Sequence, residues 1–356
     1  MKAGLVGLPL AGKSTLFQLL TGAAPPAGRP EARVGVAKVP DPRVEALAGM
    51  FSPRKTTHAT VEYVDVPGTA KGEGAALVDL PALRGVDALV HVVRAFDNEL
   101  VPHPEGSVDP LRDARVLELE LMLADLALVE RRLERLEQSI KKAKRAEDVA
   151  ERELFSSLKA ALEAEKPLRE VELAEEDRRR LRSYSLLTEK PMLVAVNLGE
   201  DLIAQAASFA ASSGLQEWAS RPGVGLVAVS APIEAEMAQL SAEDAAAFRA
   251  DLHLSEPGVD RLARASYALL GLISFLTAGE DECRAWTIRS GTRAQQAAGT
   301  IHSDIERGFI RAEVVAFDEL MKAGSIAACR DRGTLRLEGK EYLVRDGDVI
   351  NFRFSV

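Results

Sequence analysis

The segment Gly7–Thr15 constrains this chain more than any other part of its sequence. It reads Gly-Leu-Pro-Leu-Ala-Gly-Lys-Ser-Thr and matches the pattern G-x-x-x-x-G-K-[ST] at every fixed position. An apolar run, Lys2–Val6, precedes it, and Ser14–Leu20 has the spacing of a helix with one apolar face. A strand, a glycine-rich turn and a helix in this order predict a phosphate-binding loop, because backbone N–H groups and the helix N-terminus then converge on phosphate oxygens.

The fixed residues of this loop predict separate roles. Gly7 and Gly12 allow the backbone to bend, and Lys13 is expected to reach the β- and γ-phosphates. The hydroxyl of Ser14 is expected to bind Mg²⁺. We therefore expect the loop to bind a nucleoside triphosphate with Mg²⁺ as its cofactor.

A second motif supplies the acidic group that a Mg²⁺ site requires. The apolar run Thr60–Val64 ends at Asp65, and Val-Pro-Gly68 completes the pattern D-x-x-G. Asp65 can hold Mg²⁺ through water, while the N–H of Gly68 can approach a γ-phosphate. The pattern is weak alone, but it lies at a strand end about 50 residues after the loop, which predicts the metal side of the same site.

The segment expected to recognise the base departs from the guanine-specific pattern. Asn197-Leu198-Gly199-Glu200 stands at a strand end where GTPases carry N-K-x-D. The side chain of Glu200 is one methylene longer than aspartate, so its carboxylate no longer matches the paired N–H groups of guanine. Losing that match removes roughly 1–3 kcal/mol of discrimination. We therefore expect weak guanine preference, with ATP as the main ligand and GTP as a possible one.

The strand signals predict a mostly parallel sheet. They are separated by helical segments, which is typical of α/β proteins. Ser230 and Ala231 follow the last of these strands and are expected beside the base, unless they form only a strand-to-helix turn. The predicted strands are Gly4–Val6, Thr60–Val64, Ala88–Val93, Met192–Val196 and Leu226–Val229.

A long helical segment interrupts this sheet. A second helical run, Ala150–Leu162, follows the first and ends near Pro167. The two runs predict an antiparallel hairpin whose tip carries Lys141, Lys142, Lys144 and Arg145. Such a charge run is usually only solvated, but at the end of a projecting arm it is a candidate contact with nucleic acid or a ribosome. The first run carries apolar residues at alternating spacings of three and four, as in a coiled coil: Leu119, Met122, Leu126, Val129, Leu133, Leu136, Ile140 and Ala143.

From about Phe275 the pattern changes to short β runs between glycine turns, which predicts a small α+β domain. Expected strands are Arg284–Ile288, Glu341–Val344 and Val349–Phe354, with a helix around Ala297–Ile301. The predicted architecture is an α/β P-loop domain over 1–112 and 184–274, the inserted helical hairpin over 113–183, and the C-terminal domain over 275–356.

Composition narrows the range of partners. A net charge of −9 over 356 residues gives no bulk attraction to DNA or to a membrane surface. The N-terminal apolar run is broken by Gly7, Pro9 and Lys13, so it does not fit a signal peptide, and no stretch is long enough to span a membrane. The two cysteines form no spacing motif. We expect a cytoplasmic protein and take a monomer as the default.

Together these residues resemble the Obg-like ATPase family, known in bacteria as YchF, within the translation-factor (TRAFAC) class of P-loop proteins. The resemblance rests on the phosphate-binding loop, Val39–Arg43, the hairpin and the N-x-x-E pattern. It implies a TGS domain with a ubiquitin-like β-grasp fold, and a nucleoside triphosphatase that usually prefers ATP and associates with ribosomes. The C-terminal segments that look like the TGS domain are Phe275–Gly279, Arg284–Ile288, Gln296–Asp304, Gly308–Glu313 and Val344–Val349.

The resemblance also implies roles for particular residues. Leu10 to Thr15, with Ala11 and Gly12 between them, would surround the phosphates, and Leu198 with Ser230 and Ala231 would surround the base. The family lacks the glutamine with which GTPases orient water, and a loop histidine is thought to replace it. His103 occupies that position here, and a neutral imidazole could orient the water or accept its proton. An exposed loop histidine without a role is the alternative.

This chain departs from the family pattern at both switches. The position of the first-switch threonine falls near Arg29, and no Thr lies between Ala23 and Arg33. In the second switch, Thr69-Ala70 joins Gly68 directly to Lys71, which is a shorter connection than the family has. Leu10-Ala11 also replaces the family's Asn-Val.

We therefore predict a slow ATPase in which Lys13 and His103 are catalytic, with GTP as a possible second substrate. The alternatives are a nucleotide-gated binding module with little turnover and a GTPase with relaxed base specificity.

Overall fold

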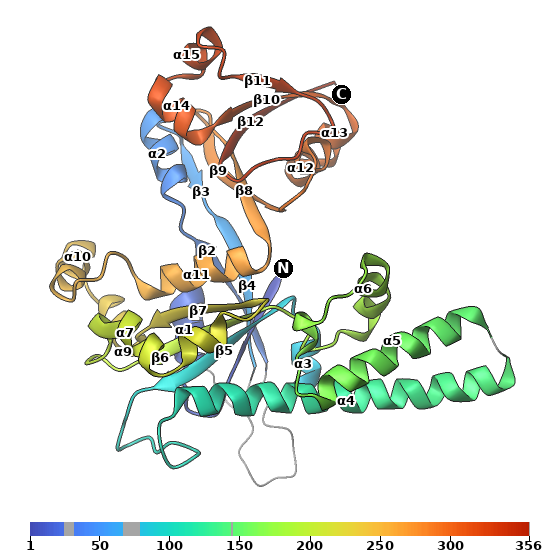
Figure 1. The fold of residues 1–356 in the computed structure, drawn as a ribbon. Coiled ribbons are helices and arrows are strands. Elements are labelled where there is room, and N and C mark those ends of the chain that lie inside the picture. Colours follow the sequence, from blue (N-terminus) through green and yellow to red (C-terminus); the bar gives the residue numbers. More distant parts are fainter. Residues whose placement is uncertain (25–31, 67–78, 144, 356) are drawn as a thin grey trace. The chain divides into compact units, whose positions relative to one another are not determined.

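The computed structural model describes residues 1–24, 32–66, 79–143 and 145–355, and it divides into two compact units. Unit 1 comprises Met1–Val36 and Glu62–Leu269, and unit 2 comprises Ala37–Val61 and Leu270–Val356. The chain therefore enters unit 2 twice, once near its beginning and once at its end (Figure 1).

Unit 1 is built on a six-stranded sheet with the order β2-β4-β1-β5-β6-β7. The pairs from β4 through β1, β5 and β6 to β7 are parallel, and β5 and β6 are buried along their whole length. Continuous burial is expected of parallel strands that helices cover on both faces. All five predicted strands are confirmed, whereas β2 was not predicted. The strands are β1 (Lys2–Val6), β2 (Arg33–Val39), β4 (Ala59–Asp65), β5 (Ala88–Ala95), β6 (Met192–Leu198) and β7 (Val224–Val229).

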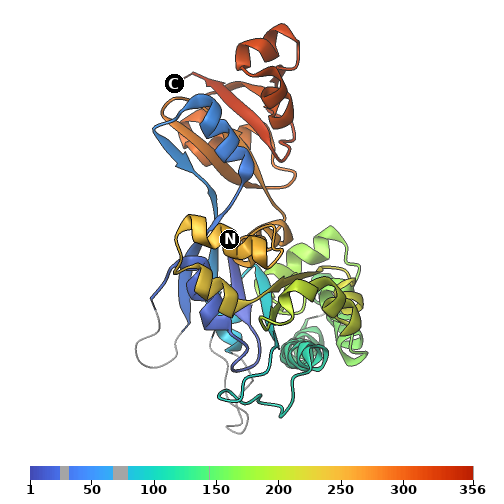
Figure 2. The same ribbon diagram turned by 90° about the vertical axis from the view of Figure 1, so that its left-hand side faces the viewer.

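Helices cover both faces of this sheet (Figures 1 and 2). Residues of α3, α4, α8 and α9 join the strands in one apolar core, while α1 and α11 contact each other on the opposite face. The α-helices of unit 1 are α1 (Lys13–Thr21), α3 (Leu80–Arg84), α4 (Pro110–Lys142), α5 (Ala146–Glu163), α6 (Glu175–Leu181), α7 (Ala206–Ser212), α8 (Leu215–Ala219), α9 (Ala231–Met237), α10 (Ala242–Asp251) and α11 (Gly258–Leu269). Three 3₁₀ turns cover Leu168–Glu170, Arg182–Tyr184 and Ile203–Gln205.

The predicted helical hairpin is confirmed as α4 and α5, but its apolar seam is not continuous. Early in α4, Leu117 and Leu121 pack in the core of the sheet, and farther along Met122 and Val129 pack with residues of α5. Leu119, which was predicted to lie in the seam, is 44% exposed. The seam prediction is wrong at this residue because the partner of α4 changes from the sheet to α5 along its length. The first turns of α4 therefore belong to the core of unit 1, whereas the predicted hairpin began at residue 113.

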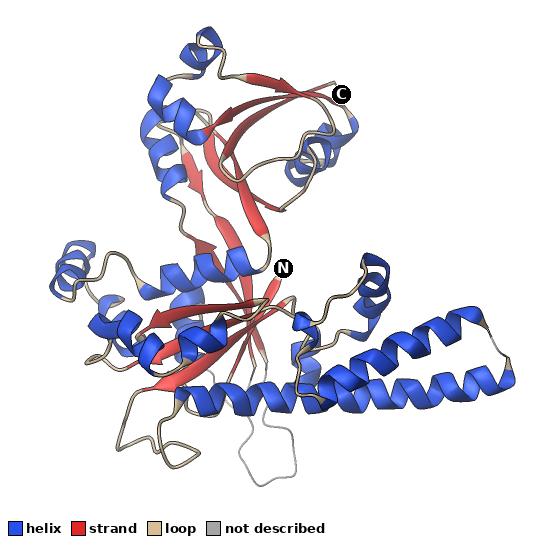
Figure 3. Ribbon diagram, in the orientation of Figure 1, coloured by secondary structure: helices blue, strands red, loops and turns tan. Residues whose placement is uncertain are grey.

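Unit 2 contains a second six-stranded sheet with the order β11-β10-β12-β8-β9-β3. Strands β8 and β9 form an antiparallel pair, β12 runs parallel to β8, and β10 runs antiparallel to β12 and β11. This is the strand order of the predicted β-grasp fold, with α12 against the sheet (Figure 3). The C-terminal elements are β8 (Leu272–Thr277), β9 (Glu282–Arg289), α12 (Ala294–Ile301), α13 (Ser303–Arg307), β10 (Phe309–Ala316), α14 (Phe317–Ala323), α15 (Ile326–Asp331), β11 (Arg336–Glu338) and β12 (Asp348–Phe354).

The sixth strand comes from the N-terminal segment of unit 2, which carries α2 (Pro42–Phe51) and β3 (Lys55–Thr57). Strand β3 runs parallel to β9 with Lys55 opposite Glu282, and the Thr57 hydroxyl lies 2.5 Å from a carboxylate oxygen of Glu282. Arg43 of α2 donates to Asp346 at 2.8 Å. The predicted P-loop domain included this segment, and the structure instead places residues 37–61 in unit 2.

One predicted strand of unit 2 is wrong. Glu341–Val344 forms no strand, and only an isolated bridge joins Leu343 to Arg293. Tyr342 and Val344 both pack on the apolar core, and this alternation of inward side chains imitates the pattern of a strand. In the described ranges of the chain, no helix is long and apolar enough to cross a membrane.

Candidate functional site

The turn between β1 and α1 has the backbone geometry that its two fixed glycines allow. Gly7 has φ +151°, and a Cβ there would lie 2.3 Å from the carbonyl oxygen of Val92. Gly12 has φ +95°, and a Cβ there would lie 2.3 Å from Nδ2 of Asn197. Neither position accepts a side chain without a rearrangement. Among the described residues no side chain caps α1, so its first N–H groups remain available to an anion.

Lys13 lies inside this turn. Its ammonium group donates to the carbonyl oxygens of Gly7 at 2.9 Å and Leu8 at 2.8 Å, and the residue is only 7% exposed. Burial lowers the pKa of Lys13 to about 8, and the nearby Asp65 opposes that shift. A cation held in this way is oriented toward the loop that it is predicted to serve.

The expected metal ligands differ in exposure. Ser14 and Thr15, at the start of α1, are exposed, whereas Asp65, at the end of β4, is buried. Strand pairing places Asp65 opposite Leu5 of β1, so the carboxylate follows the strand that leads into the loop. Gly68 lies outside the described residues, as do Arg29 and Thr69–Lys71 of the two switches.

The two carboxylate oxygens of Asp65 differ in their hydrogen bonds to the described residues. Oδ2 accepts a hydrogen bond from Arg33 at 2.7 Å, whereas buried Oδ1 has no partner among the described residues. An unpartnered buried carboxylate oxygen and an exposed hydroxyl fit the oxygen preference of Mg²⁺. The described residues contain no cluster of three or more His, Cys, Asp or Glu that could hold a metal ion by itself. Mg²⁺ at this position would therefore also need phosphate oxygens and water.

Asn197 connects the two ends of the site. Its Nδ2 donates to the carbonyl oxygen of Ala11 at 3.0 Å, and its Oδ1 accepts from the N–H of Ala231 at 2.9 Å. The residue is 1% exposed, so these bonds form in a water-poor environment. Asn197 thus acts here as a brace between the phosphate-binding loop and the start of α9.

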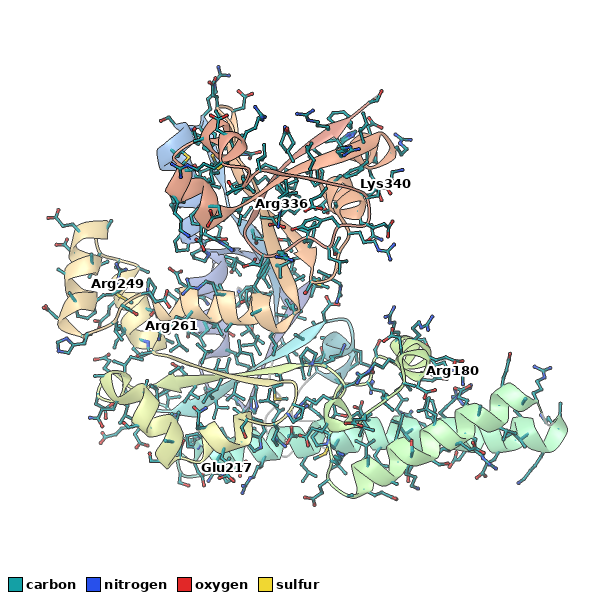
Figure 4. The ribbon with its side chains drawn as sticks, turned by 45° about the horizontal axis from the view of Figure 1, so that its top comes forward. Arg180, Glu217, Arg249, Arg261, Arg336 and Lys340 are labelled. Atoms are coloured by element: carbon teal, nitrogen blue, oxygen red, sulfur yellow. The ribbon has the colours of Figure 1, made fainter. Side chains whose placement is uncertain are left out.

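The residues around Asn197 do not all face the same space. Leu198 is fully buried in the core of the sheet, and the buried hydroxyl of Ser230 has no partner within the part of the chain that the structure describes. Arg261 of α11, labelled in Figure 4, donates to the carbonyl oxygen of Ala228 at 2.9 Å and so fixes the end of β7. Ser230 and Ala231 begin α9, as a strand-to-helix turn would, and Ala231 also contacts the Asn197 brace.

A pocket of about 540 Å³ opens where β5, β6 and β7 end. Its lining includes the carboxylates of Asp97, Glu200 and Asp201, together with Phe96 and Pro232. Ligands of parallel sheets bind at the carboxyl ends of the strands, so this pocket is the candidate base site. Of the predicted base residues, Glu200 lines it.

His103 lies in the loop before α4, and both of its ring nitrogens are engaged. Nδ1 accepts from the N–H of Glu105 at 3.1 Å, and Nε2 lies 2.8 Å from a carboxylate oxygen of Asp113. Because Nδ1 is an acceptor here, the proton resides on Nε2 and is donated to Asp113. The His103 side chain is 3% exposed. To reach an attacking water, this imidazole would have to leave Asp113.

The hairpin tip presents the predicted basic cluster. Lys141, Lys142 and Arg145 are exposed and form no ion pair with a described residue, while Lys144 lies outside the described residues.

Sequence reasoning missed several residues of the site. Arg33 carries no motif, and only its pairing with Asp65 reveals it. Phe96, Asp97, Asp201 and Pro232 line the pocket, and a general signal was present for them because each follows the end of a parallel strand.

Comparisons with known proteins agree with this geometry. Residues 2–123 match a family model described as a 50S ribosome-binding GTPase. Residues 272–355 match a model of the YchF GTPase C-terminal domain, described as a protein of unknown function (DUF933).

Several curated relatives align with the full length of the chain. It is 44% identical to the ribosome-binding ATPase YchF of Bacillus subtilis, with all of both chains covered. It is 41% identical to the ribosome-binding ATPase YchF of Haemophilus influenzae, covering 100% of this chain and 99% of that protein. It is 37% identical to Obg-like ATPase 1 of Oryza sativa, covering 100% of this chain and 92% of that protein.

A solved structure also matches over nearly the whole chain. The YchF GTPase of Schizosaccharomyces pombe superposes with a TM-score of 0.86 at 30% identity, covering 99% of this chain and 97% of that one. Identity at this level over full-length alignments establishes common descent and a common fold. The chain therefore belongs to the YchF family of Obg-like ATPases.

Proposed function

We propose that this protein binds ATP with Mg²⁺ in the turn between β1 and α1 and hydrolyses it slowly, with GTP as a poorer second substrate. The observation that carries the proposal is the turn itself. Gly7 and Gly12 adopt conformations that side chains would block, and the N-terminus of α1 is uncapped among the described residues. A backbone of this form is suited to phosphate oxygens.

The described side chains supply complementary parts of the chemistry. Lys13 would neutralise charge on the transferred phosphoryl group, and Leu10 to Thr15 would contribute backbone N–H groups. Ser14 and Asp65 would hold Mg²⁺, which supplies charge neutralisation on the phosphates when bound. Gly68 would approach the γ-phosphate. We propose His103 as the group that orients the attacking water once it is released from Asp113.

Base selection is assigned to the pocket that Glu200 lines. Leu198 packs in the sheet beneath it, and Asn197 braces the turn at Ser230 and Ala231 that follows β7. The glutamate is exposed, so its carboxylate adapts to more than one base edge. Competition of ATP and GTP for one fluorescent analogue measures this preference. A tenfold advantage of GTP, about 1.4 kcal/mol, would contradict the assignment.

We further propose that the protein acts on ribosomes as a monomer. Relatives that include the Bacillus subtilis and Haemophilus influenzae proteins carry the description ribosome-binding, and the exposed basic tip at Lys141, Lys142 and Arg145 offers charge for phosphate contacts. The β-grasp sheet of unit 2 is a second candidate surface. Cosedimentation with ribosomes, comparing the unchanged protein with a triple Lys141→Glu, Lys142→Glu, Arg145→Glu variant, tests the tip.

Steady-state phosphate release tests hydrolysis directly. The unchanged protein should release phosphate from Mg-ATP, and Lys13→Ala should lower the rate by roughly 100-fold or more, because the main cation of the site is lost. Equal rates for the two proteins would reject the proposal.

The engaged state of His103 favours a second candidate, a nucleotide-gated binding module with little turnover. Both ring nitrogens are occupied within the fold, so the imidazole of His103 is not free to act as a base in this arrangement. Single-turnover measurements distinguish the candidates. Bound ATP that persists, with or without ribosomes, would support the binding module, and rapid conversion to ADP would exclude it.

A further inference from the structure

Asp65, the acidic residue of the metal side, already has a cationic partner. Arg33, the first residue of β2, donates from NH2 to Oδ2 of Asp65 at 2.7 Å. The Asp65 side chain is 7% exposed and that of Arg33 is 24% exposed. Water therefore screens this ion pair only partly, so it is stronger than a fully exposed surface pair.

Arg33 is held in place by two further contacts. Its NH1 donates to the carbonyl oxygen of Ala24 at 3.0 Å, and its guanidinium lies over the ring of Phe17 at 4.9 Å from the centroid. The planar guanidinium thus joins the middle of α1, the chain that follows α1, and the end of β4. This arrangement orients the cation toward Asp65 rather than toward solvent.

We infer that Arg33 is a built-in competitor of Mg²⁺ at Asp65, and that this residue sets how strongly nucleotide binding depends on the metal. The inference rests on the proposed function, because it assumes that a Mg-nucleotide occupies the site. Oδ1 of Asp65 has no partner among the described residues, so Mg²⁺ can approach the carboxylate while Arg33 holds Oδ2. One negative charge cannot neutralise a guanidinium and a divalent cation at once, and the two cations repel each other. Arg33 therefore weakens the attraction of Asp65 for Mg²⁺.

The same arrangement has a consequence without metal. With Arg33 in place, the carboxylate of Asp65 is neutralised and does not repel the phosphates of a metal-free nucleotide. Arg33 should therefore improve metal-free binding and oppose metal-dependent binding. Its removal changes the two affinities in opposite directions.

The experiment measures the Kd of a fluorescent ADP, which has no γ-phosphate to be hydrolysed, in EDTA and in excess Mg²⁺. The readout is the Kd in EDTA divided by the Kd in excess Mg²⁺, measured for the full-length chain. Arg33→Gln should raise this ratio by about tenfold, which corresponds to one charge-assisted hydrogen bond. Arg33→Lys keeps the charge but loses the planar contact with Phe17, so it should raise the ratio by only about threefold.

Arg132→Gln is the matched control. Arg132 also forms a partly exposed ion pair, with Glu151 at 2.8 Å, but on the hairpin rather than at the site. Its ratio should equal that of the unchanged protein. If Arg33→Gln does not fold, Arg33→Lys still tests the inference, because both substitutions are expected to change the ratio in the same direction.

Two results would overturn the inference. An unchanged ratio in both Arg33 variants would mean that Asp65 serves both cations together or neither. A parallel weakening of both Kd values would mean that Arg33 binds phosphate directly. Failure of the unchanged protein to bind fluorescent ADP under either condition would instead reject the proposed function, and the inference with it.

Discussion

The phosphate end and the base end of the candidate site are constructed in opposite ways. At the phosphate end, Gly7 lies against a carbonyl group, Gly12 lies against Asn197, and Lys13 is buried with two carbonyl partners. At the base end, an open pocket is lined by Asp97, Glu200 and Asp201, whose carboxylates stand on connections that follow the strands. Under the proposed assignment, triphosphate binding depends on backbone geometry, whereas base choice depends on a few side chains that can change without disturbing the fold.

The largest expected effect is at the phosphate end. Gly12→Ala would place a methyl group 2.3 Å from Nδ2 of Asn197 at a φ of +95°, so the loop or the Asn197 brace has to move. We expect ATP affinity to fall by roughly 100-fold or more, as measured by calorimetric titration.

Gly22→Ala is its control. Gly22 also has a positive φ, of +67°, but a Cβ there meets nothing within 4 Å. It should lose about 1 kcal/mol of stability and keep its ATP affinity. If both variants lose ATP affinity equally, the contact between position 12 and Asn197 does not explain the loss.

A second test uses pH at the same end. Lys13 has a pKa of about 8 in the free protein, and phosphate binding requires its charged form. Above that pH the complex has to take up a proton, so affinity falls as pH rises. Between about pH 7.5 and about pH 9.5 we expect Kd to increase about 25-fold, with proton uptake visible as a dependence of the calorimetric heat on the buffer.

The sign for folding is opposite to the sign for binding. The unfolded chain keeps the Lys13 proton up to its ordinary pKa of 10.5, while the folded chain loses it near 8. The unfolded state therefore binds more protons in this window, and the stability of the ligand-free protein should rise with pH there.

For the binding experiment, Lys190→Met is the matched control, because burial also lowers the pKa of Lys190, whose ammonium donates to the carbonyl oxygens of Arg84 and Val86. If Kd does not change with pH in the unchanged protein, or if its pH dependence disappears in Lys190→Met, the assignment to Lys13 is wrong.

At the base end we expect a smaller and more selective change. Glu200→Asp shortens the carboxylate to the length that guanine recognition uses, and it should shift relative affinity toward GTP by about tenfold with little effect on stability. Competition between ATP and GTP measures the shift. Glu200→Gln keeps the length but loses the charge, and it should give no gain for GTP. A gain in both variants would show that length is not the deciding property.

The smallest expected effect concerns Leu10, where the family pattern has asparagine. Leu10 has φ +63°, a conformation that is unfavourable for leucine, and its side chain is 53% exposed. Burial of this side chain therefore does little to offset the backbone strain. Leu10→Asn should stabilise the protein by about 0.5–1 kcal/mol in urea unfolding, because asparagine tolerates this conformation better. Leu240→Asn, at another exposed leucine without a positive φ, should change stability by less than about 0.5 kcal/mol.

The same contrast explains what could be predicted from the sequence. The phosphate-binding loop and the five strands were predictable because their signals are local, and Asp65 was recognisable from its place at a strand end. Arg33 was not, because no motif marks the arginine and its ion pair with Asp65 joins residues that are 32 positions apart. The pairing of β3 with β9 was also hidden, since three polar residues at Lys55–Thr57 carry no strand pattern of their own.

His103 shows a different limit. Its position was identified by resemblance alone, and nothing in the local sequence indicated that Asp113 would engage its imidazole. Its role in turnover stays a prediction. Two other predictions failed although the apolar spacing is present in the sequence. Leu119 is exposed because α4 changes its packing partner along its length, and Glu341–Val344 is an irregular segment with an isolated bridge rather than a strand.

The early entry of the chain into unit 2 has a consequence for how the protein is made. Strand β3 pairs with β9, and the Thr57–Glu282 contact spans 225 residues. At translation rates of roughly 5–20 residues per second, β3 and α2 therefore wait roughly 10–45 seconds for their partner to be synthesised. During that interval the nascent chain carries an unmatched strand, so chaperone capture or mispairing is most favoured there, and a fragment beginning at Leu272 would leave the outer edge of β9 uncovered.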